Sequence, residues 1–356
     1  MNILISGVGG PTPRSVSRSI KISKYKEKTR LFGTDINPYC SGLYESGLYE
    51  KNILVPSARN KKYWDTIKEF IHENDIKYAM IQPEQAALEW SLHKEKGGKW
   101  PCKTILPDYE LVKVLMDKGA MTTILSDSGL VPKSYVINPE DLDLERLEEA
   151  LRYPFWIRST SGSSGLGSLK VESREGLKNW FTINPGVSEF IASTFLPKRN
   201  LACKLLYYNG NLIRSACGER VNYIMSKVAP SGITGNTSFG RLLNEPNLVS
   251  LATEAMELLF KATNTKKHGF FTADFKEDDK GIPYLTEINI RMVAFNYSFA
   301  LGGANFSEDI LALMSDDVSF DRAYKMYEFE PGTIFLRDVD VEPILMKESD
   351  LIQKSI

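Results

Sequence analysis

The chain has 356 residues, of which 42% are hydrophobic, 25% charged and 11% aromatic. These fractions lie near the averages of folded globular proteins, and they exclude disordered, collagen-like and fibrous classes. Lysine and arginine number 44 against 45 aspartates and glutamates, so the net charge of -1 gives no general reason to expect a nucleic acid or an anionic membrane as partner. The length predicts two or three domains.

Targeting signals are not evident in the sequence. Glycine, proline and arginine follow directly after the five-residue apolar run at the start, which is not the order of a signal peptide. No stretch approaches the roughly 20 apolar residues that cross a bilayer. We therefore expect a soluble, cytoplasmic protein. The cysteines have no CxxC spacing, and we expect reduced packing residues at Cys40, Cys102, Cys203 and Cys217.

Residues 1–108 alternate between strand and helix patterns. Strands are expected at 2–6, before Asp35, at 52–56 and before Pro83-Glu84, with helices between them. This alternation predicts a parallel, doubly wound sheet. The carboxyl ends of such strands are where open α/β sheets bind ligands.

A glycine turn follows the first strand. Gly7, Gly9 and Gly10, together with Asp35, permit a dinucleotide-binding interpretation. Thr12 and Pro13 stand where that motif needs its third glycine, so binding of NAD is the less favoured alternative. The favoured interpretation is a domain that contributes a wall to a substrate pocket.

The next segment combines a helix, a strand and a phosphate-type loop. We expect one helix from an N-cap at Asp108 to a stop at Gly129, with Lys118 within it. Arg158 ends an apolar strand, and residues 161–168 hold three glycines and four serines. Such a loop brings backbone N–H groups close to phosphate oxygens. It is not a Walker loop, because no Gly-Lys-Ser or Gly-Lys-Thr follows.

Acidic and amide side chains converge on a later pair of strands. Asp274 lies on one strand, and Glu287 and Asn289 lie two residues apart on the next, so these two share a face. A hairpin brings Asp274 across to them. Two carboxylates and an amide oxygen suit Mg²⁺ that carries a nucleoside triphosphate. Arg291, two residues further along, is expected to point to the same side and to add a positive charge beside the phosphates.

The order of these segments resembles the ATP-grasp superfamily, in particular its carbamoyl phosphate synthetase-like carboxylate-amine ligases. The resemblance covers roughly residues 2–315 and implies an α/β and α+β architecture, in which a Rossmann-like pre-grasp domain precedes a two-subdomain ATP-grasp fold. It implies a pre-grasp domain at 1–108, a small subdomain with the phosphate loop at 109–195 and a large subdomain with the metal site at 196–315. Residues 316–356 form a tail of unknown role.

The resemblance also implies roles for individual residues. Lys118 and Arg158 would clamp phosphates, and Asp274, Glu287 and Asn289 would bind Mg²⁺, two ions in this family, with Mn²⁺ as an alternative ion. Arg291, Arg220 and Lys118 would act in catalysis, and residues 229–238 would face the acceptor. The remaining nucleotide-binding residues implied by the resemblance are Ser161, Gly162, Ser163, Ser164, Gly165, Gly167, Ser193, Thr194, Phe195, Leu196 and Asn200.

The adenine region departs from the family pattern, because Asn200 stands where a glutamate usually holds the ribose. The function implied is an ATP-dependent ligase that joins a small-molecule carboxylate to an amine through an acyl phosphate, releasing ADP and phosphate. A small-molecule kinase, a carbamoyl phosphate synthetase-like enzyme and a non-catalytic nucleotide-binding protein remain alternatives. The expected partners are small molecules, with no nucleic acid and no membrane, and a homodimer is one open oligomeric state.

Overall fold

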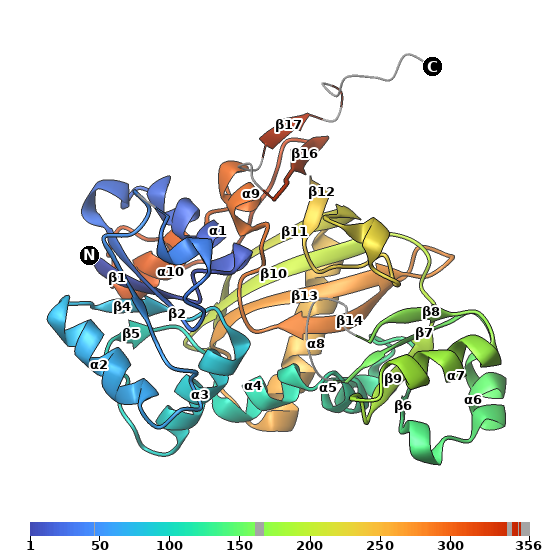
Figure 1. The fold of residues 1–356 in the computed structure, drawn as a ribbon. Coiled ribbons are helices and arrows are strands. Elements are labelled where there is room, and N and C mark those ends of the chain that lie inside the picture. The colour runs from blue at the N-terminus through green and yellow to red at the C-terminus, as the bar shows by residue number, and fades with distance from the viewer. Residues whose placement is uncertain (46, 161–166, 340–343, 348, 350–356) are drawn as a thin grey trace.

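The computed structural model describes residues 1–45, 47–160, 167–339, 344–347 and 349. Within this part of the chain the strands form three sheets, one parallel and two largely antiparallel. Figure 1 shows the parallel sheet and the small antiparallel sheet on opposite sides of the large one. The mixed α/β character expected from the sequence is confirmed.

The parallel sheet has the strand order β3-β2-β1-β4-β5, and every neighbouring pair is parallel. Its central strand supplies fully buried Ile3, Leu4 and Ile5, which is typical of a strand covered on both faces. The first helix starts at Pro11, because proline suits the first turn of a helix. The elements are β1 (Asn2–Ser6), α1 (Pro11–Lys21), β2 (Arg30–Asp35), β3 (Lys51–Leu54), α2 (Tyr63–Glu73), β4 (Tyr78–Met80), α3 (Glu84–Glu95) and β5 (Lys103–Thr104).

The small sheet has the order β6-β9-β7-β8 and is antiparallel. Its inner face packs Phe155, Ile157 and Phe190 against helices α6 and α7 in a core of its own. Two short helices connect the parallel sheet to it. The elements are α4 (Tyr109–Met116), α5 (Lys118–Leu125), β6 (Ser134–Ile137), α6 (Leu144–Leu151), β7 (Phe155–Ser159), β8 (Leu169–Val171), α7 (Arg174–Ile183) and β9 (Phe190–Thr194).

The large sheet runs in the order β14-β13-β10-β11-β12-β16-β17, with β15 beside β11. The long helix α8 packs Ala252, Met256 and Leu259 into the same core as the sheet residues Leu205 and Phe271. The elements are β10 (Asn200–Tyr208), β11 (Asn211–Tyr223), β12 (Thr237–Leu243), α8 (Pro246–Thr263), β13 (Gly269–Glu277), β14 (Pro283–Asn289), α9 (Asn296–Leu301), α10 (Phe306–Met314), β15 (Lys325–Met326), β16 (Thr333–Leu336) and β17 (Ile344–Lys347).

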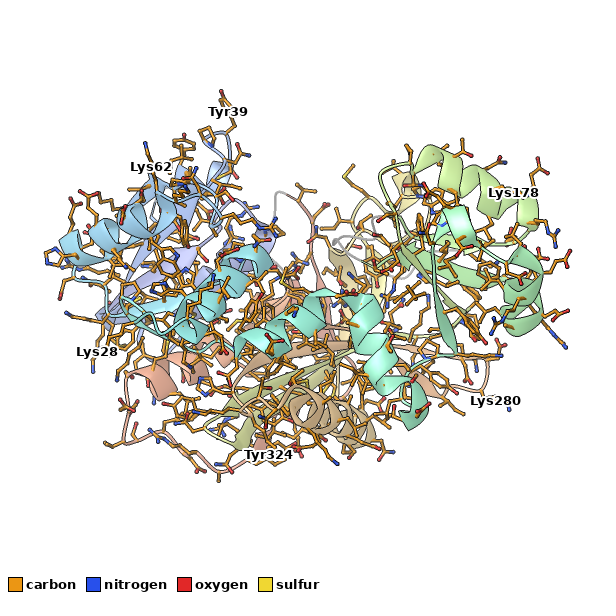
Figure 2. All side chains as sticks on the ribbon, turned by 90° about the horizontal axis from the view of Figure 1, so that it is seen from below. Lys28, Tyr39, Lys62, Lys178, Lys280 and Tyr324 are labelled. Atoms are coloured by element: carbon orange, nitrogen blue, oxygen red, sulfur yellow. The ribbon has the colours of Figure 1, made fainter. Side chains whose placement is uncertain are left out.

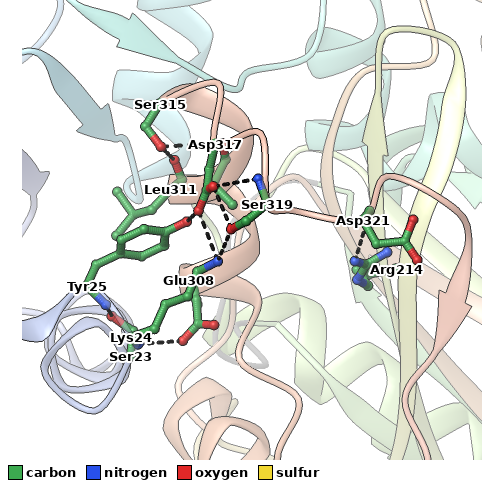
Figure 3. Close-up of polar contacts among 11 residues, drawn as sticks. Ser23, Lys24, Tyr25, Arg214, Glu308, Leu311, Ser315, Asp317, Ser319 and Asp321 are labelled. Carbon is green, nitrogen blue, oxygen red and sulfur yellow. Dashed lines mark hydrogen bonds and ion pairs between the residues drawn. The ribbon is translucent and has the colours of Figure 1, made fainter.

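The segment after residue 315 is built into the fold. β16 pairs with β12, and Arg214 donates to the backbone oxygen of Asp321 at 2.5 Å. Figure 3 shows a second contact, in which Asp317 accepts hydrogen bonds from Tyr25 and from the backbone N–H of Ser319. These bonds tie the segment after α1 to the segment after α10. The C-terminal residues therefore hold the parallel sheet against the large sheet.

The surface of the described chain is polar and mixed in charge. Figure 2 shows exposed side chains at the edge of the molecule, directed away from the cores: Lys28, Tyr39, Lys62, Lys178 and Lys280. Tyr324, also labelled there, is half exposed, and its hydroxyl lies 2.9 Å from Ser215 Oγ. Among the described residues no helix combines the length and apolar character that a membrane span requires. All four cysteines are free.

Candidate active site

Lys118 is positioned by a break in the chain that the sequence analysis did not predict. The expected single helix is two helices, because Asp117 leaves helical geometry with φ -105° and ψ 102°. Its carboxylate then caps α5 by accepting from the backbone N–H groups of Gly119 at 2.8 Å and Ala120 at 3.1 Å. The backbone N–H of Lys118 donates to Thr160 O at 3.0 Å. The break thus places Lys118 beside the end of β7.

Arg158 extends from β7 of the small sheet toward β14 of the large sheet. Its Nη2 donates to the backbone oxygen of Thr286, and its Nη1 lies 3.7 Å from Glu287 Oε2. The Nζ atom of Lys118 lies 3.9 Å from the same oxygen. Two cations from different elements therefore converge on one carboxylate.

Asp274, Glu287 and Asn289 meet as the hairpin argument predicted. Asp274 on β13 is the direct cross-strand partner of Glu287 on β14. The amide nitrogen of Asn289 lies 3.1 Å from Asp274 Oδ2 and 3.4 Å from Glu287 Oε1. Arg220, from β11, donates to Asp274 Oδ1 at 2.5 Å, while its Nε has no hydrogen-bond partner among the described residues.

The charges of this cluster shift one another's protonation. Burial raises the pKa of Asp274, against the lowering effect of Arg220. Burial would also raise the pKa of Glu287, but Lys118, Arg158 and Arg220 together hold it below its ordinary value. Burial lowers the pKa of Lys118, and the charge of Glu287 opposes this. Glu287 is thus kept ionised at the centre of three cations.

The donor set fits a hard divalent cation. Two carboxylates and an amide converge, and a half-turn of the Asn289 side chain would present its Oδ1 where Nδ2 now lies. Oxygen donors of this kind are those that Mg²⁺ accepts, with water and phosphate completing the coordination. In the described part of the chain no three His, Cys, Asp or Glu side chains form a metal cluster, so the third donor would be the amide.

The expectation that Arg291 lies on the same strand face as Glu287 and Asn289 is wrong. β14 ends at Asn289, so the alternation of side chains does not reach Arg291. Its Nε and Nη2 instead both lie 3.1 Å from Oε1 of Glu84, the first residue of α3. This contact joins the large sheet to the carboxyl edge of the parallel sheet.

A cavity lies between the small and the large sheets, and we call it the inter-sheet cavity. It is lined by the cluster residues other than Asn289, which lines a neighbouring space, and by the five residues implied for adenine and ribose binding. The residues from these two sets that line it are Lys118, Arg158, Ser193, Thr194, Phe195, Leu196, Asn200, Arg220, Asp274 and Glu287.

Trp156 and Lys276 are among the residues lining the inter-sheet cavity that were not predicted from the sequence. The Nζ atom of Lys276 lies 5.8 Å from the Trp156 ring centre and 5.7 Å from that of Phe195. Burial lowers the pKa of Lys276. Lys276 stands two residues after Asp274 on the same strand face, and that spacing was the available signal.

The glycine and serine loop can be placed only at its end. Ser161, Gly162, Ser163, Ser164 and Gly165 lie outside the described residues. Gly167 has φ +67°, and its carbonyl accepts from Trp180 Nε1 at 3.0 Å. It does not line the inter-sheet cavity, whereas its neighbour Ser168 does.

A second cavity of about 650 Å³, the edge cleft, opens at the carboxyl edge of the parallel sheet. Such a volume is within the range of small-molecule sites. It shares Lys118, Arg220 and Glu287 with the inter-sheet cavity, so the two spaces meet at the charged cluster. Gly235 and Asn236, from the stretch expected to face an acceptor, also line it. Its other lining residues include Gly7, Thr12, Arg59, Gln82, Glu84, Gln85, Asn289 and Arg291.

Comparisons with known proteins agree with this geometry. No family model matches the chain. D-alanine--D-alanine ligase B from Clostridium perfringens is 25% identical over 185 residues, or 49% of this chain. The match spans 57% of the length of that ligase.

Among solved structures, N5-carboxyaminoimidazole synthetase from Staphylococcus aureus, complexed with ADP, aligns with a TM-score of 0.69 and 18% identity over 94% of this chain and 81% of that one. L-amino acid ligase from Bacillus licheniformis aligns with a TM-score of 0.65 and 16% sequence identity. That alignment covers 94% of this chain and 78% of the ligase chain. The chain has the ATP-grasp fold of these ligases, so the resemblance seen in the motifs is confirmed at the level of the fold.

Proposed function

We propose that the protein is an ATP-dependent ligase that joins a small-molecule carboxylate to an amine through an acyl phosphate. The observation that carries the proposal is the junction of the two cavities at Lys118, Arg220 and Glu287. A nucleotide in the inter-sheet cavity would place its terminal phosphate at this junction. An acceptor in the edge cleft would reach the same point.

ATP and Mg²⁺ are the proposed cofactors. The rim of the inter-sheet cavity at 193–196 and Asn200 would contact adenine and ribose, and Arg158 and Lys118 would hold phosphate oxygens. Asp274, Glu287 and Asn289 would bind Mg²⁺, with two ions as in the family, and the metal would neutralise charge on the transferred phosphoryl group. The aromatic and aliphatic lining beside buried cations supports this assignment.

Arg220 and Arg291 are proposed to stabilise the acyl phosphate. Both line the edge cleft, and the buried Nε of Arg220 has no hydrogen-bond partner in the part of the chain that the structure describes. A planar guanidinium suits carboxylate and phosphate oxygens. Preorganised donors of this kind are the main source of rate acceleration in transfer reactions that lack a protein nucleophile.

The division into domains is part of the proposal. Residues 1–108 would form a Rossmann-like pre-grasp domain, 109–195 the small subdomain and 196–315 the large subdomain. The three sheets fall into these ranges, except that β15 to β17 extend the large sheet beyond residue 315. We therefore propose that the large subdomain includes this C-terminal segment.

A coupled assay of ADP release tests the function. Purified protein with ATP and Mg²⁺ is screened against amino acids and sugar acids, alone and with amines. We expect ADP only when a carboxylate and an amine are both present. ADP release with a single acceptor would indicate a kinase, and nucleotide binding without turnover would contradict an enzymatic role.

A further inference from the structure

Glu84 stands out among the groups that line the edge cleft. The carboxylates in that lining are Glu84 and Glu287. Glu287 is surrounded by cations and belongs to the proposed metal set, so its charge is already engaged. Glu84 is the remaining carboxylate that faces the space proposed for the acceptor.

The two oxygens of Glu84 have different surroundings. Both contacts from Arg291, through Nε and Nη2 at 3.1 Å each, go to Oε1. Among the described residues no hydrogen bond is made to Oε2. The side chain is 29% exposed and lines the edge cleft, so it is partly accessible from that space.

The backbone around Glu84 is held rigidly. Gly7 has φ +73°, and a Cβ there would lie 2.4 Å from the ring of Pro83, so only glycine lets the two turns pack this closely. The backbone N–H of Gln82 donates to Ser6 Oγ at 3.0 Å. Glu84 is also the first residue of α3, where a negative charge is favourable. The glycine turn thus supports Glu84 rather than a dinucleotide.

We propose that Oε2 of Glu84 binds the ammonium form of the amine substrate and takes its first proton. This inference rests on the proposed ligase function. Loss of that proton frees the lone pair on nitrogen, which forms the C–N bond with the acyl carbon. The C–O bond to phosphate breaks, and its electron pair stays on the phosphate oxygen. The second nitrogen proton leaves with the phosphate, and Glu84 returns its proton to solvent.

The variant Glu84→Gln isolates this role. Glutamine keeps an Oε1 that can accept both contacts from Arg291, and it loses only the charge and the basic second oxygen. The matched control is Glu95→Gln, the same change at an exposed residue of the same helix, outside the cleft lining. Both variants are compared with the wild-type protein by thermal unfolding.

Two nucleophiles distinguish the role of Glu84 from a merely structural one. The acyl phosphate is captured either by the amine that the ADP-release screen identifies or by hydroxylamine, which is uncharged at neutral pH and needs no base. In Glu84→Gln we expect kcat/KM for amide formation to fall by roughly 10²-fold or more. Hydroxamate formation should stay near the wild-type rate, and Glu95→Gln should match the wild type in both reactions.

Each other outcome decides against the inference. Equal losses of amide and hydroxamate in Glu84→Gln would mean that Glu84 serves only to place Arg291. Unchanged amide formation would mean that the amine does not use Glu84. If the wild-type protein itself releases no ADP with any pair, the ligase proposal fails, and the role of Glu84 fails with it.

Discussion

Glu287 is the residue at which the most interactions of the site meet. Its carboxylate lies 3.9 Å from Lys118 and 3.7 Å from Arg158, and it faces Asp274 across the strand pair. Burial alone would favour its neutral form, and the three surrounding cations reverse this. A carboxylate kept charged in a buried position is characteristic of functional sites.

Replacing Glu287 by glutamine should abolish turnover and preserve the fold. The change keeps the shape of the side chain but removes half of the negative charge available to a metal ion. We expect ADP release to fall by roughly 10²- to 10³-fold, the scale on which a preorganised electrostatic group acts. Circular dichroism should match the wild type. Glu254→Gln, at an exposed position on α8, is the control, and wild-type activity in Glu287→Gln would disprove the metal assignment.

His268 provides a test of pH dependence away from the site. Burial, assisted by Lys94, lowers the pKa of His268 to about 4 from its ordinary 6.5, and its Nδ1 accepts from the backbone of Asn209 at 3.3 Å. Between these two pH values the unfolded chain binds a proton that the folded protein does not. Protonation of His268 in the unfolded chain therefore lowers the free energy of unfolding as the pH decreases from 6.5 to 4. Above pH 6.5 the histidine is neutral in both states and has no such effect.

The loss amounts to at most about 3.5 kcal/mol, at about 1.4 kcal/mol for each unit of pKa. Urea unfolding at pH 7, 5 and 4 measures it. His268→Asn keeps an acceptor in place of Nδ1 and should flatten this part of the profile, whereas exposed His72→Asn should leave it unchanged. If the free energy of unfolding falls equally with decreasing pH in the wild type and in His268→Asn, other groups cause the acid sensitivity.

At the scale of elements, short breaks position the charged residues. α4 and α5 would form a continuous helix on the pattern of apolar residues, but Asp117 interrupts it and caps α5. β14 ends at Asn289, which releases Arg291 from the strand and lets it reach Glu84. In each case the regular geometry ends at one residue, and the direction of a side chain proposed to act in the site changes there.

The cap at Asp117 can be tested directly. Asp117→Ala removes the acceptor of two backbone N–H groups and should lower the free energy of unfolding by about 1 kcal/mol. Since the cap also sets the position of Lys118, KM for ATP should rise. Asp117→Asn retains a capping oxygen, so its free energy of unfolding and its KM for ATP should be close to those of the wild type. If Asp117→Ala lowers the free energy of unfolding no more than Asp127→Ala at an exposed position does, the role of the cap is refuted.

At the scale of the whole molecule, the site depends on all three sheets. Arg158 comes from the small sheet, Asp274 and Glu287 from the large sheet, and Glu84 from the edge of the parallel sheet. The C-terminal segment adds contacts between the parallel and large sheets, among them that of Tyr25 with Asp317 (Figure 3). Ligand binding should therefore stabilise the assembly of the sheets as a unit.

ADP with Mg²⁺ should raise the temperature of thermal unfolding by several degrees. A ligand at 100 times its Kd contributes about 2.7 kcal/mol to the folded state. Chelation of the metal with EDTA should remove most of the shift, because Asp274 and Glu287 then face the phosphates without a bridging cation. NAD should give no comparable shift. A larger stabilisation by NAD than by ADP would favour the dinucleotide interpretation of the glycine turn.

Much of the fold and the site was predictable from local patterns. Strand and helix periodicity, a hairpin between Asp274 and Glu287, and the order of charged segments depend on residues close together in sequence. They determined the ATP-grasp resemblance and the main cations and carboxylates. Residues 193–196, which were expected to contact adenine, line one cavity together with the charged cluster, and their contact with adenine stays a prediction.

Only the tertiary structure decided the contacts between distant segments. Glu84 and Arg291 are 207 positions apart, and the C-terminal segment joins the large sheet through β12. No periodicity encodes such pairs, because they arise when separately formed sheets pack and bury their edges. For the same reason the sequence could name a metal set and phosphate clamps, but it could not show that the two cavities meet at Glu287 with Glu84 facing the second.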